Sequence, residues 1–515
     1  MHDGRRLLLQ AAARVAALAV LAPHLPAQAR SAANGAYPFT LGVASGAPLP
    51  DSVILWTRLL PDPLNAASMP SIAQQVRWEV AHDEGFTRIA AKGMAVAAPA
   101  LAHSVNVDVR GLEPDRWYWY RFMLGDAVSP VGRTRTAPAP GSMPAALKLA
   151  VASCQHWEFG HYAAHRHIAQ AAPDLVAFLG DYIYEWGPYS LQHPATVLRR
   201  NESFTLDEYR ARYAQYKSDP DLQAAHHAAP WLLTWDDHEV ANDYSPTRDE
   251  LLSPDFVQRR AAAYQAYFEH QPLRAQRIYQ RYDWGQLARF HVLDTRQYRS
   301  IHACQPTGRG GSSSVYRRAC AALADPRRSM LGSEQEQWLA QGLKESRARW
   351  NILAQQTLMA QMSQLPLASD SDGRFWTDGW DGYAAARGRL LESVRSARNP
   401  LVLSGDVHTF FAADLRRDPA RAAGPGNAVV ATEFCGTSVT SSSRPQARTQ
   451  QYVDMNRDMH FGRSDKRGFM LLDLRPERAA VLLQGLDNVR DANSALSTLA
   501  SFSVADGKPG PRRES

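Results

Sequence analysis

Side chains that can bind metal ions or anions follow five apolar segments of the sequence, each directly after the segment ends. These segments and residues are 147–153 with Cys154, 175–180 with Asp181, 231–235 with Asp236 to Glu239, 290–293 with Asp294, and 401–405 with Asp406 and His408. A single aspartate after an apolar run is usually a turn or capping residue. Ligands of open α/β sheets bind outside the carboxyl ends of the strands, so five such ends together predict one shared metal site.

The residue types in this set suit two different metal ions. Asp181 follows Gly180, whose missing side chain permits a tight turn, and Tyr184 lies at the same predicted strand end. A carboxylate, a phenolate and a thiolate together with one imidazole suit a highly charged ion such as ferric iron. Asp237 and Asp406 offer hard oxygen donors of the kind that hold Ca²⁺, Mg²⁺ or Mn²⁺. Two kinds of donor imply two kinds of metal.

Two regions of different pattern must position these residues. From residue 147 to about 505, short apolar runs alternate with helical stretches, which predicts an α/β or layered α+β domain. Residues 37–136 contain short alternating runs, and 112–122 resembles the corner and following strand of a fibronectin-III-like β-sandwich. The stretch 136–144 is rich in Pro and Gly and predicts a linker. Residues 507–515 are expected to form a disordered tail.

The first 29 residues have the pattern of an export signal. Arg5 and Arg6 precede an apolar run from Ala11 to Ala22, and Ala27-Gln28-Ala29 is the small-x-small pattern that signal peptidases accept. The twin arginine favours the Tat export machinery, which moves folded proteins, over the Sec route. No later stretch reaches the roughly 18 consecutive apolar residues of a membrane-spanning helix. We therefore expect a periplasmic or secreted protein without a transmembrane anchor.

The composition narrows the class of partner. The formal net charge of +6 and the isoelectric point of about 9.1 suit an anionic substrate, but over 515 residues this charge is too dilute to indicate nucleic-acid binding. We expect a monomer. In an oxidising compartment Cys304 and Cys320 could form a disulfide, and the sequence leaves open whether they do.

Seven short motifs occur in order along the chain. They are Val151 to Gln155 (VASCQ), Gly180 to Glu185 (GDYIYE), Thr234 to Asp243 (TWDDHEVAND), Leu293 to Tyr298 (LDTRQY), Trp380 to Tyr383 (WDGY), Leu403 to His408 (LSGDVH) and Thr432 to Ser438 (TEFCGTS). The ordered set resembles that of the PhoD-type alkaline phosphatases, members of the PhoD-like metallophosphoesterase family. The resemblance covers almost the whole chain after the signal, including the N-terminal region.

The resemblance implies a calcineurin-like metallophosphoesterase core, in which a β-sandwich is flanked by helices and binds a ferric iron with one or more calcium ions. Carried over by motif, the iron ligands would be Cys154, Asp181, Tyr184 and His408. Asp181 would bridge to calcium held by Asp237 and Asp406, with Asn242 as a further candidate ligand.

The chain departs from most metallophosphoesterases at two of these motifs. It has Asp236-Asp237-His238-Glu239 where they have Gly-Asn-His-Glu, and Gly405-Asp406-Val407-His408 where they have Gly-His-x-His. Both substitutions replace a neutral ligand by a carboxylate, which favours a hard ion such as Ca²⁺. The histidine ligand that many relatives carry on an intermediate strand is missing, because residues 351–356 contain no histidine. The coordination of the second metal therefore stays open.

These observations predict an exported, metal-dependent phosphoester hydrolase that releases phosphate from phosphomonoesters, with a metal-activated hydroxide as the attacking group. His238 would orient the phosphate or assist the leaving group, and Arg296 would bind phosphate with its planar set of N–H donors. The nearest alternative is a phosphodiesterase or phospholipase D-type enzyme on the same scaffold. A distant alternative is a non-catalytic cell-surface binding protein. Such a protein would be expected to lack the metal-binding residues at the strand ends, whereas here they are present.

Overall fold

The computed structural model describes residues 36–515 except 187–201, 275–276, 369–370, 420, 422–423 and 425. The export signal expected at residues 1–29 therefore lies outside the described residues. Among the described residues, no helix combines the length and the apolar character that crossing a bilayer requires.

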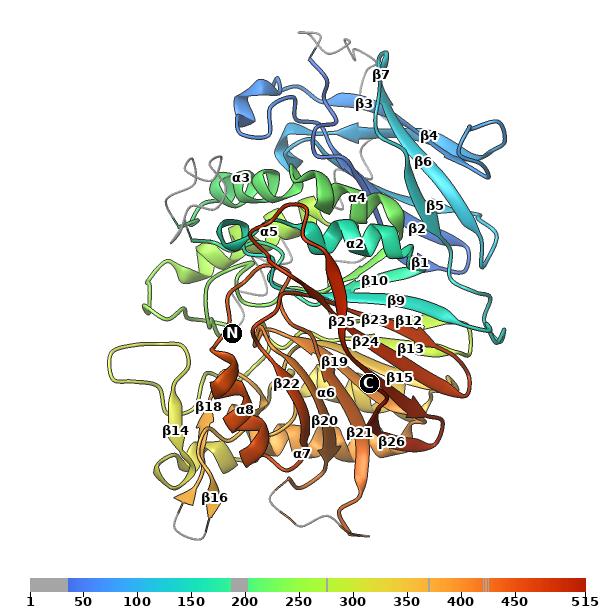
Figure 1. The fold of residues 1–515 in the computed structure, drawn as a ribbon. Coiled ribbons are helices and arrows are strands. Elements are labelled where there is room, and N and C mark those ends of the chain that lie inside the picture. The colour runs from blue at the N-terminus through green and yellow to red at the C-terminus, as the bar shows by residue number, and fades with distance from the viewer. Residues whose placement is uncertain are drawn as a thin grey trace.

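Two large sheets form the centre of the molecule (Figure 1). Within the described residues the first sheet has ten strands, in the order β26 (Lys508–Arg513), β25 (Leu496–Ala505), β24 (Arg478–Leu486), β23 (Gly468–Leu474), β9 (Leu147–Ala152), β10 (Leu175–Phe178), β11 (Trp231–Leu233), β1 (Val43–Leu49), β2 (Ser52–Arg58) and β5 (Ser104–Arg110). Strands β9, β10 and β11 are parallel neighbours, and β23 pairs antiparallel with β9.

The second sheet has seven strands in the described part of the chain. Their order is β12 (Gln280–Trp284), β13 (Ala288–Val292), β15 (Trp350–Thr357), β19 (Pro400–Gly405), β21 (Val429–Cys435), β20 (Phe410–Arg416) and β22 (Met459–Arg463). Strands β13, β15, β19 and β21 are parallel to one another. Each sheet thus has a parallel centre whose strands all point their carboxyl ends the same way.

The two sheets pack face to face and bury an apolar core between them. Along β9, Leu147, Leu149 and Val151 point into this core, whereas Ala150 and Ala152 belong to the cluster on the outer face. This alternation is the period of two that a strand requires. Because both faces of the strand are covered, its sequence is apolar almost throughout, which explains the nearly continuous apolar runs.

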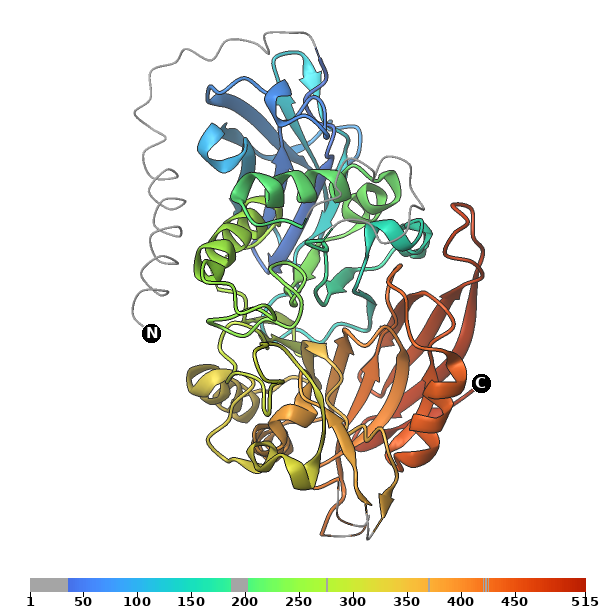
Figure 2. The ribbon, with the colours of Figure 1, turned by 90° about the vertical axis from the view of Figure 1, so that its left-hand side faces the viewer.

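Helices cover the outer faces of both sheets. The ten-stranded sheet is covered by α2 (Ala163–Ala171), α3 (Leu206–Lys217), α4 (Pro220–Ala228) and α5 (Phe256–His270). The seven-stranded sheet is covered by α6 (Gly332–Lys344) and α7 (Ala384–Ser393), and α8 (Gln446–Met455) packs beside β22. Figure 2 shows the N-terminal strands at one end of the molecule and the α6 and α7 layer at the other. The predicted β-sandwich flanked by helices is confirmed.

The N-terminal region is all-β, as predicted, but its inner strands are not separate from the core. Its outer sheet consists of β3 (Gln74–Ala81), β4 (Ile89–Ala97), β6 (Trp117–Leu124), β7 (Ala127–Val128) and β8 (Gly132–Arg135). Its inner strands β1, β2 and β5 extend the ten-stranded sheet, because β1 pairs parallel with β11 at Gly46 and Trp231. A Cβ atom at Gly46 would lie 2.6 Å from Pro272 O and 2.8 Å from Trp231 O, so this junction requires glycine.

The expectation of a disordered tail from residue 507 is wrong. Strand β26 pairs antiparallel with β25, and the Gly510 N–H donates a hydrogen bond of 2.8 Å to Thr432 Oγ1 in β21 of the other sheet. The guanidinium carbon of Arg513 lies 5.4 Å from the centre of the Phe461 ring. The segment is polar and has no apolar period, so its sequence carries no strand signal, and backbone pairing makes it an edge strand.

Outside the large sheets, β14 (Ser314–Tyr316) pairs with β18 (Arg374–Trp376), and β16 (Leu367–Ala368) pairs with β17 (Ser371–Asp372). Cys304 and Cys320 form a disulfide, which closes the loop that contains β14. The bridge that the sequence left open is therefore present. Trp376 of β18 donates a hydrogen bond to Ser312 Oγ in this loop, so the bridged loop helps to position Trp376.

Candidate active site

The carboxyl ends of strands from both sheets meet at one edge of the sandwich. Strands β9, β10 and β11 precede Cys154, Asp181 and Asp237, and β19 of the other sheet precedes Asp406 and His408. Three sets of donor atoms each lie within 4.8 Å of one another, namely those of Cys154, Asp181 and His408, of Asp181, Asp237 and His238, and of Asp236, Asp237 and Asp406. The structure therefore brings together four of the five strand ends that the sequence singled out.

Asp294, at the fifth strand end, is a turn residue. Its carboxylate accepts hydrogen bonds from the backbone N–H groups of Arg296 and Gln297, at 3.0 Å and 3.1 Å. This is the usual role of a single aspartate after a strand. Nearby, Gln356 of β15 donates from Nε2 to Trp235 O at 2.8 Å, and so links the ends of the two sheets. Gln356, in the stretch that lacks the relatives' histidine, is thus engaged in a structural contact.

Several candidate ligands have a left-handed backbone conformation. The φ angle is 60° at Cys154, 56° at Asp181, 62° at Asp406 and 53° at His408. For a residue other than glycine this conformation costs about 1–3 kcal/mol, and such strain concentrates at functional sites. The turn predicted at Gly180 is needed, because its φ is 106° and a Cβ atom there would lie 2.5 Å from Asp236 Cβ.

The Cys154 group consists of Cys154, Asp181, Tyr184 and His408. Tyr184 Oη lies 2.9 Å from Asp181 Oδ2 and 3.2 Å from His408 Nε2. His408 Nδ1 lies 2.6 Å from Ser442 O. A carbonyl oxygen only accepts hydrogen bonds, so Nδ1 carries the proton of the neutral ring, and Nε2 keeps its lone pair for a metal. A sulfur, a carboxylate, a phenol and an imidazole thus converge on one place.

Burial raises the pKa of the Cys154 thiol, the Asp181 carboxyl and the Tyr184 phenol well above their usual ranges. The negative charge of Asp181 raises the pKa of Cys154 and Tyr184 further. A bound cation of high charge would reverse this balance, because it favours the anionic form of each ligand. Three acids and one imidazole on rigid strand ends are a donor set that suits ferric iron.

The Asp237 group consists of Asp236, Asp237 and Asp406. Asp236 Oδ2 and Asp237 Oδ1 are buried and accept no hydrogen bond from a described residue. Burial raises the pKa of Asp406 to about 7. Burial also acts to raise the pKa of Asp237, but Arg296 and His238 outweigh it and hold that pKa below its usual value. Buried carboxylate oxygens without a donor suit a hard divalent cation such as Ca²⁺.

The loop after Asp237 adds two polar residues. Asn242, a predicted candidate ligand, lines the cavity at the site, and its backbone N–H donates to Glu185 Oε1 at 2.6 Å. Asp243 also lines the cavity, and the sequence reasoning missed it. Burial raises the pKa of Asp243 to about 8, and its Oδ2 accepts a hydrogen bond from Ser312 Oγ. Asp243 lies in the same sequence motif as Asp237, and this position was the signal that could have identified it.

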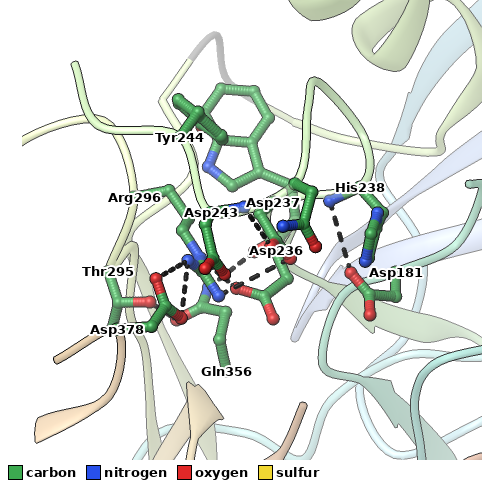
Figure 3. Close-up of polar contacts among 12 residues, drawn as sticks. Asp181, Asp236, Asp237, His238, Asp243, Tyr244, Thr295, Arg296, Gln356 and Asp378 are labelled. Atoms are coloured by element: carbon green, nitrogen blue, oxygen red, sulfur yellow. Dashed lines mark hydrogen bonds and ion pairs between the residues drawn. The ribbon is translucent and has the colours of Figure 1, made fainter. Parts of the chain in front are cut away.

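His238 contacts two members of the Cys154 group, and its ring lies within 4.8 Å of the Asp237 carboxylate. Its backbone N–H donates to Asp181 Oδ1 at 3.4 Å (Figure 3), its Nδ1 lies 2.8 Å from Glu185 Oε2, and its ring stacks on Tyr184 with centroids 4.1 Å apart. Burial acts to lower the pKa of His238, but Asp237, Glu185 and Asp181 outweigh it and raise this pKa well above its usual value. These acidic neighbours favour the protonated imidazole in the metal-free protein, and the ring lies beside the cavity, where it can act as a general acid.

Arg296 does not line the cavity, contrary to the expectation that it binds phosphate. Its side chain is buried, and its Nε donates to Asp236 Oδ1, while Nη1 lies 2.9 Å and 3.0 Å from the two oxygens of Asp378 (Figure 3). Its Nη2 lies 3.6 Å from Asp237 Oδ1. Asp378 is held in turn by Arg299, whose Nη2 lies 2.9 Å from Oδ1. Arg296 thus compensates the charge of the carboxylates from a buried position outside the cavity.

The two groups open into one cavity of about 280 Å³. Its lining residues are Asp181, Asp237, His238, Asn242, Asp243, Trp376, Asp406, Val407, His408, Ser442, Ser443 and Arg444. A cavity of this size holds a small ligand or one end of a larger one. The carboxylates that line the cavity would repel an anion unless cations lie between the carboxylates and the anion. The cavity therefore suits an anionic group bound together with metal ions.

Two packed sheets with helical cover, and two neighbouring donor groups at their edge, define the chain as a metallophosphoesterase. The sequence profile of the PhoD-like phosphatase family matches residues 149–483, and that of the PhoD-like phosphatase N-terminal domain matches residues 25–138. The chain is 42% identical over 535 aligned positions to alkaline phosphatase D of Bacillus subtilis (strain 168). The alignment covers 99% of this chain and 89% of that protein. The chain belongs to the PhoD-like phosphatase family.

Solved structures agree with this assignment. A structure of PhoD matches with a TM-score of 0.87 and 42% identity, and the match covers 93% of each chain. The purple acid phosphatase PPD1 from yellow lupin (Lupinus luteus) seeds matches with a TM-score of 0.56 and 12% identity, over 92% of this chain and 75% of that one. This second match shows a shared fold alone. The family resemblance drawn from the seven motifs is confirmed.

Proposed function

We propose that the protein is an exported, metal-dependent hydrolase that releases phosphate from phosphomonoesters, with ferric iron at the Cys154 group and calcium at the Asp237 group. The observation that carries this proposal is that Asp181 of the Cys154 group lies with its carboxylate within 4.8 Å of a carboxylate oxygen of Asp237, and that both residues line one cavity. When bound, the cations would neutralise the charge of the phosphoryl group and supply an activated water for attack on phosphorus. The name of the Bacillus subtilis relative, alkaline phosphatase D, supports the same class of reaction.

The position of each candidate ligand decides which of the two ions it would bind. Cys154, Tyr184 and His408 would hold the iron, and Asp237 and Asp406 would hold the calcium. Asp181, whose carboxylate lies within 4.8 Å of that of Asp237, would bridge the two ions, and Asn242 would complete the calcium side from the cavity wall. Arg296 favours the ionised form of Asp237, whose pKa lies below its usual value, and it fixes Asp236 in place through an ion pair.

His238 is the group that would move a proton. Its Nδ1–H is directed to Glu185, which fixes the ring and leaves the second N–H of the imidazolium available. As the ester P–O bond breaks, this N–H would give its proton to the leaving-group oxygen, so that the alcohol departs neutral. His238→Gln should therefore slow esters with poorly stabilised alkoxide leaving groups more than aryl esters, whose leaving group needs less protonation.

The metals and the ester class are tested together on the purified protein. Removal of Ca²⁺ with a selective chelator should abolish hydrolysis of p-nitrophenyl phosphate, and added Ca²⁺ should restore it. Restoration by Zn²⁺ but never by Ca²⁺ would refute the calcium assignment. The monoester should be hydrolysed faster than bis(p-nitrophenyl) phosphate, and the reverse order would favour the phosphodiesterase alternative.

Export is tested separately. A metal-loaded site benefits from assembly before translocation, and this supports the Tat route that Arg5 and Arg6 indicate. Replacement of both arginines by lysine should leave the precursor in the cytoplasm, as detected by fractionation and immunoblotting. Unchanged export of the lysine variant would contradict the proposal without affecting the metal assignment.

A further inference from the structure

Arg444 brings a permanent positive charge to a cavity whose other charged walls are mainly acidic. It lines the cavity together with Ser442 and Ser443, from the segment between β21 and α8, which contributes none of the candidate metal ligands. An arginine stays protonated throughout the pH range in which the protein is folded. A basic side chain on such a wall is placed for the anionic part of a ligand.

The guanidinium of Arg444 is supported by apolar groups. Its Nη1 lies 3.9 Å from Met362 Sδ, and its Cζ lies 5.5 Å from the centroid of the Tyr452 ring. In the described part of the chain, no hydrogen bond or ion pair joins Arg444 to a carboxylate, and Asp406 acts on it only through its charge. Arg296 is the opposite case, since two of its three nitrogen atoms are hydrogen-bonded to Asp236 and Asp378. Arg444 therefore presents donors to the cavity, whereas Arg296 is buried and does not line it.

The segment that carries Arg444 is tied to the Cys154 group. Ser442 O accepts the hydrogen bond of His408 Nδ1, and Ser443 Oγ lies 2.9 Å from Thr409 Oγ1. One residue earlier, Ser441 O accepts a hydrogen bond of 2.6 Å from Arg467 Nη1. The backbone before Arg444 is thus fixed relative to the donor atoms of the site. A preorganised donor loses little entropy when it binds.

We propose that Arg444 binds the phosphoryl oxygens of the substrate and of the phosphate product, the role that sequence reasoning gave to Arg296. The inference rests on the proposed phosphoester hydrolysis. The planar guanidinium presents parallel N–H donors that match two oxygens of a phosphoryl group. A monoester dianion attracts this cation more strongly than a diester monoanion does, so Arg444 also favours monoesters.

The test compares Arg444→Gln with Arg448→Gln. Arg448 is the matched control, because its Cζ lies 5.0 Å from the same Tyr452 ring and its Nε bonds Tyr452 Oη at 3.0 Å, but it does not line the cavity. Arg444→Gln should raise the inhibition constant for inorganic phosphate and the KM for p-nitrophenyl phosphate by about 10-fold or more, the loss typical of a charge-assisted hydrogen bond. Iron and calcium contents should stay at wild-type levels. Arg448→Gln should leave both constants within about 2-fold.

Two outcomes would overturn the inference. One is an unchanged phosphate inhibition constant in Arg444→Gln, and the other is an equal rise in Arg448→Gln, which would point to an effect on helix packing. Calorimetric binding of inorganic phosphate to the metal-loaded protein gives a readout that does not need turnover. If the wild-type protein binds phosphate but hydrolyses no monoester, the proposed function fails, while the phosphate affinity of Arg444→Gln still decides the role of Arg444.

Discussion

The Cys154 group and the Asp237 group balance their charges in different ways. In the Asp237 group the chain supplies its own cation, since Arg296 contacts Asp236 and Asp237 and the pKa of Asp237 lies below its usual value. In the Cys154 group the acids contact one another, and burial raises the pKa of Cys154 and of Tyr184 well above their usual ranges. One half of the site is therefore partly ionised in the protein itself, and the other requires a metal to become ionised.

Metal ions should exchange differently at the two groups. A metal that enters the Cys154 group must displace protons from the thiol and the phenol, and it then gains strong anionic ligands. A metal that enters the Asp237 group meets carboxylates already held in place by Arg296. We therefore expect iron to remain bound during purification and calcium to exchange with the buffer.

The largest expected effect is that of Cys154→Ser. A serine hydroxyl is a poor neutral donor, so the variant should lose iron, visible absorption and activity together, with kcat/KM lower by at least about 1,000-fold if the lost cation contributes several kcal/mol. The matched control is Cys435→Ser, at the other buried free cysteine, which lies against Gly405 O. It should keep its iron and lose only modest stability. Normal iron content in Cys154→Ser would show that the thiol is no ligand.

The next effect tests the other group. Arg296→Met removes the cation from behind Asp236 and Asp237 and should lower the free energy of unfolding by about 3 kcal/mol, because buried charges lose their partner. Arg289→Met in β13 is the control, since its partner Asp283 is exposed at the surface and the pair contributes about 1 kcal/mol or less. Chemical denaturation measures both. If Arg296→Met were as stable as wild type but bound phosphate weakly, Arg296 would be the substrate-binding arginine.

A smaller effect concerns pH. Burial raises the pKa of Asp406 to about 7 and that of Asp243 to about 8, so the folded metal-free protein keeps these protons to higher pH than the unfolded chain does. These two groups must then contribute less to stability as pH rises, because each binds its proton more tightly in the native state than in the unfolded chain. Buried histidines such as His165 and His291, whose pKa burial lowers to about 3, act in the opposite direction below about pH 6.5, so the test uses the range above it. The melting temperature of the chelated protein should fall from pH 7 to pH 8, and Asp243→Asn and Ca²⁺ should each reduce the fall. A chelated protein that melts higher at pH 8 than at pH 7 would contradict this.

The smallest effect is expected for Tyr184→Phe. The change removes one iron ligand but keeps the ring that stacks on His238, so the unfolding free energy should change by only about 1 kcal/mol. The phenolate part of the visible absorption should disappear. Tyr182→Phe is the control, because its hydroxyl bonds His226 Nε2 at 2.8 Å and belongs to neither donor group. An identical spectrum in both variants would exclude Tyr184 as a ligand.

The fold and most of the site could be predicted because their signals are local. Each buried parallel strand is a short apolar run, and Cys154, Asp181 and Asp406 follow such runs directly. Two-sided burial makes the run apolar, and the edge where the strand ends is where polar side chains become accessible. The order of the seven motifs then identified the family.

The remaining features depend on contacts between distant parts of the chain. One charge partner of Arg296 is Asp378, 82 residues away, so the sequence could not show that the guanidinium is engaged on that side. Arg444 reaches the cavity only because Ser442 and its neighbours pack against His408. Strand β26 is polar and forms through backbone pairing with β25. Its side chains do not alternate between apolar and polar, so the sequence carries no signal for the strand.

The most direct test of the two-metal site is anomalous X-ray scattering from crystals of the protein purified with its native metals. At the iron absorption edge, we expect one strong peak bounded by Cys154 Sγ, Tyr184 Oη and His408 Nε2. A second, oxygen-bound ion without iron signal should lie beside Asp237 and Asp406. An iron peak away from Cys154, or a single zinc ion in place of both, would contradict the division of the site into two groups.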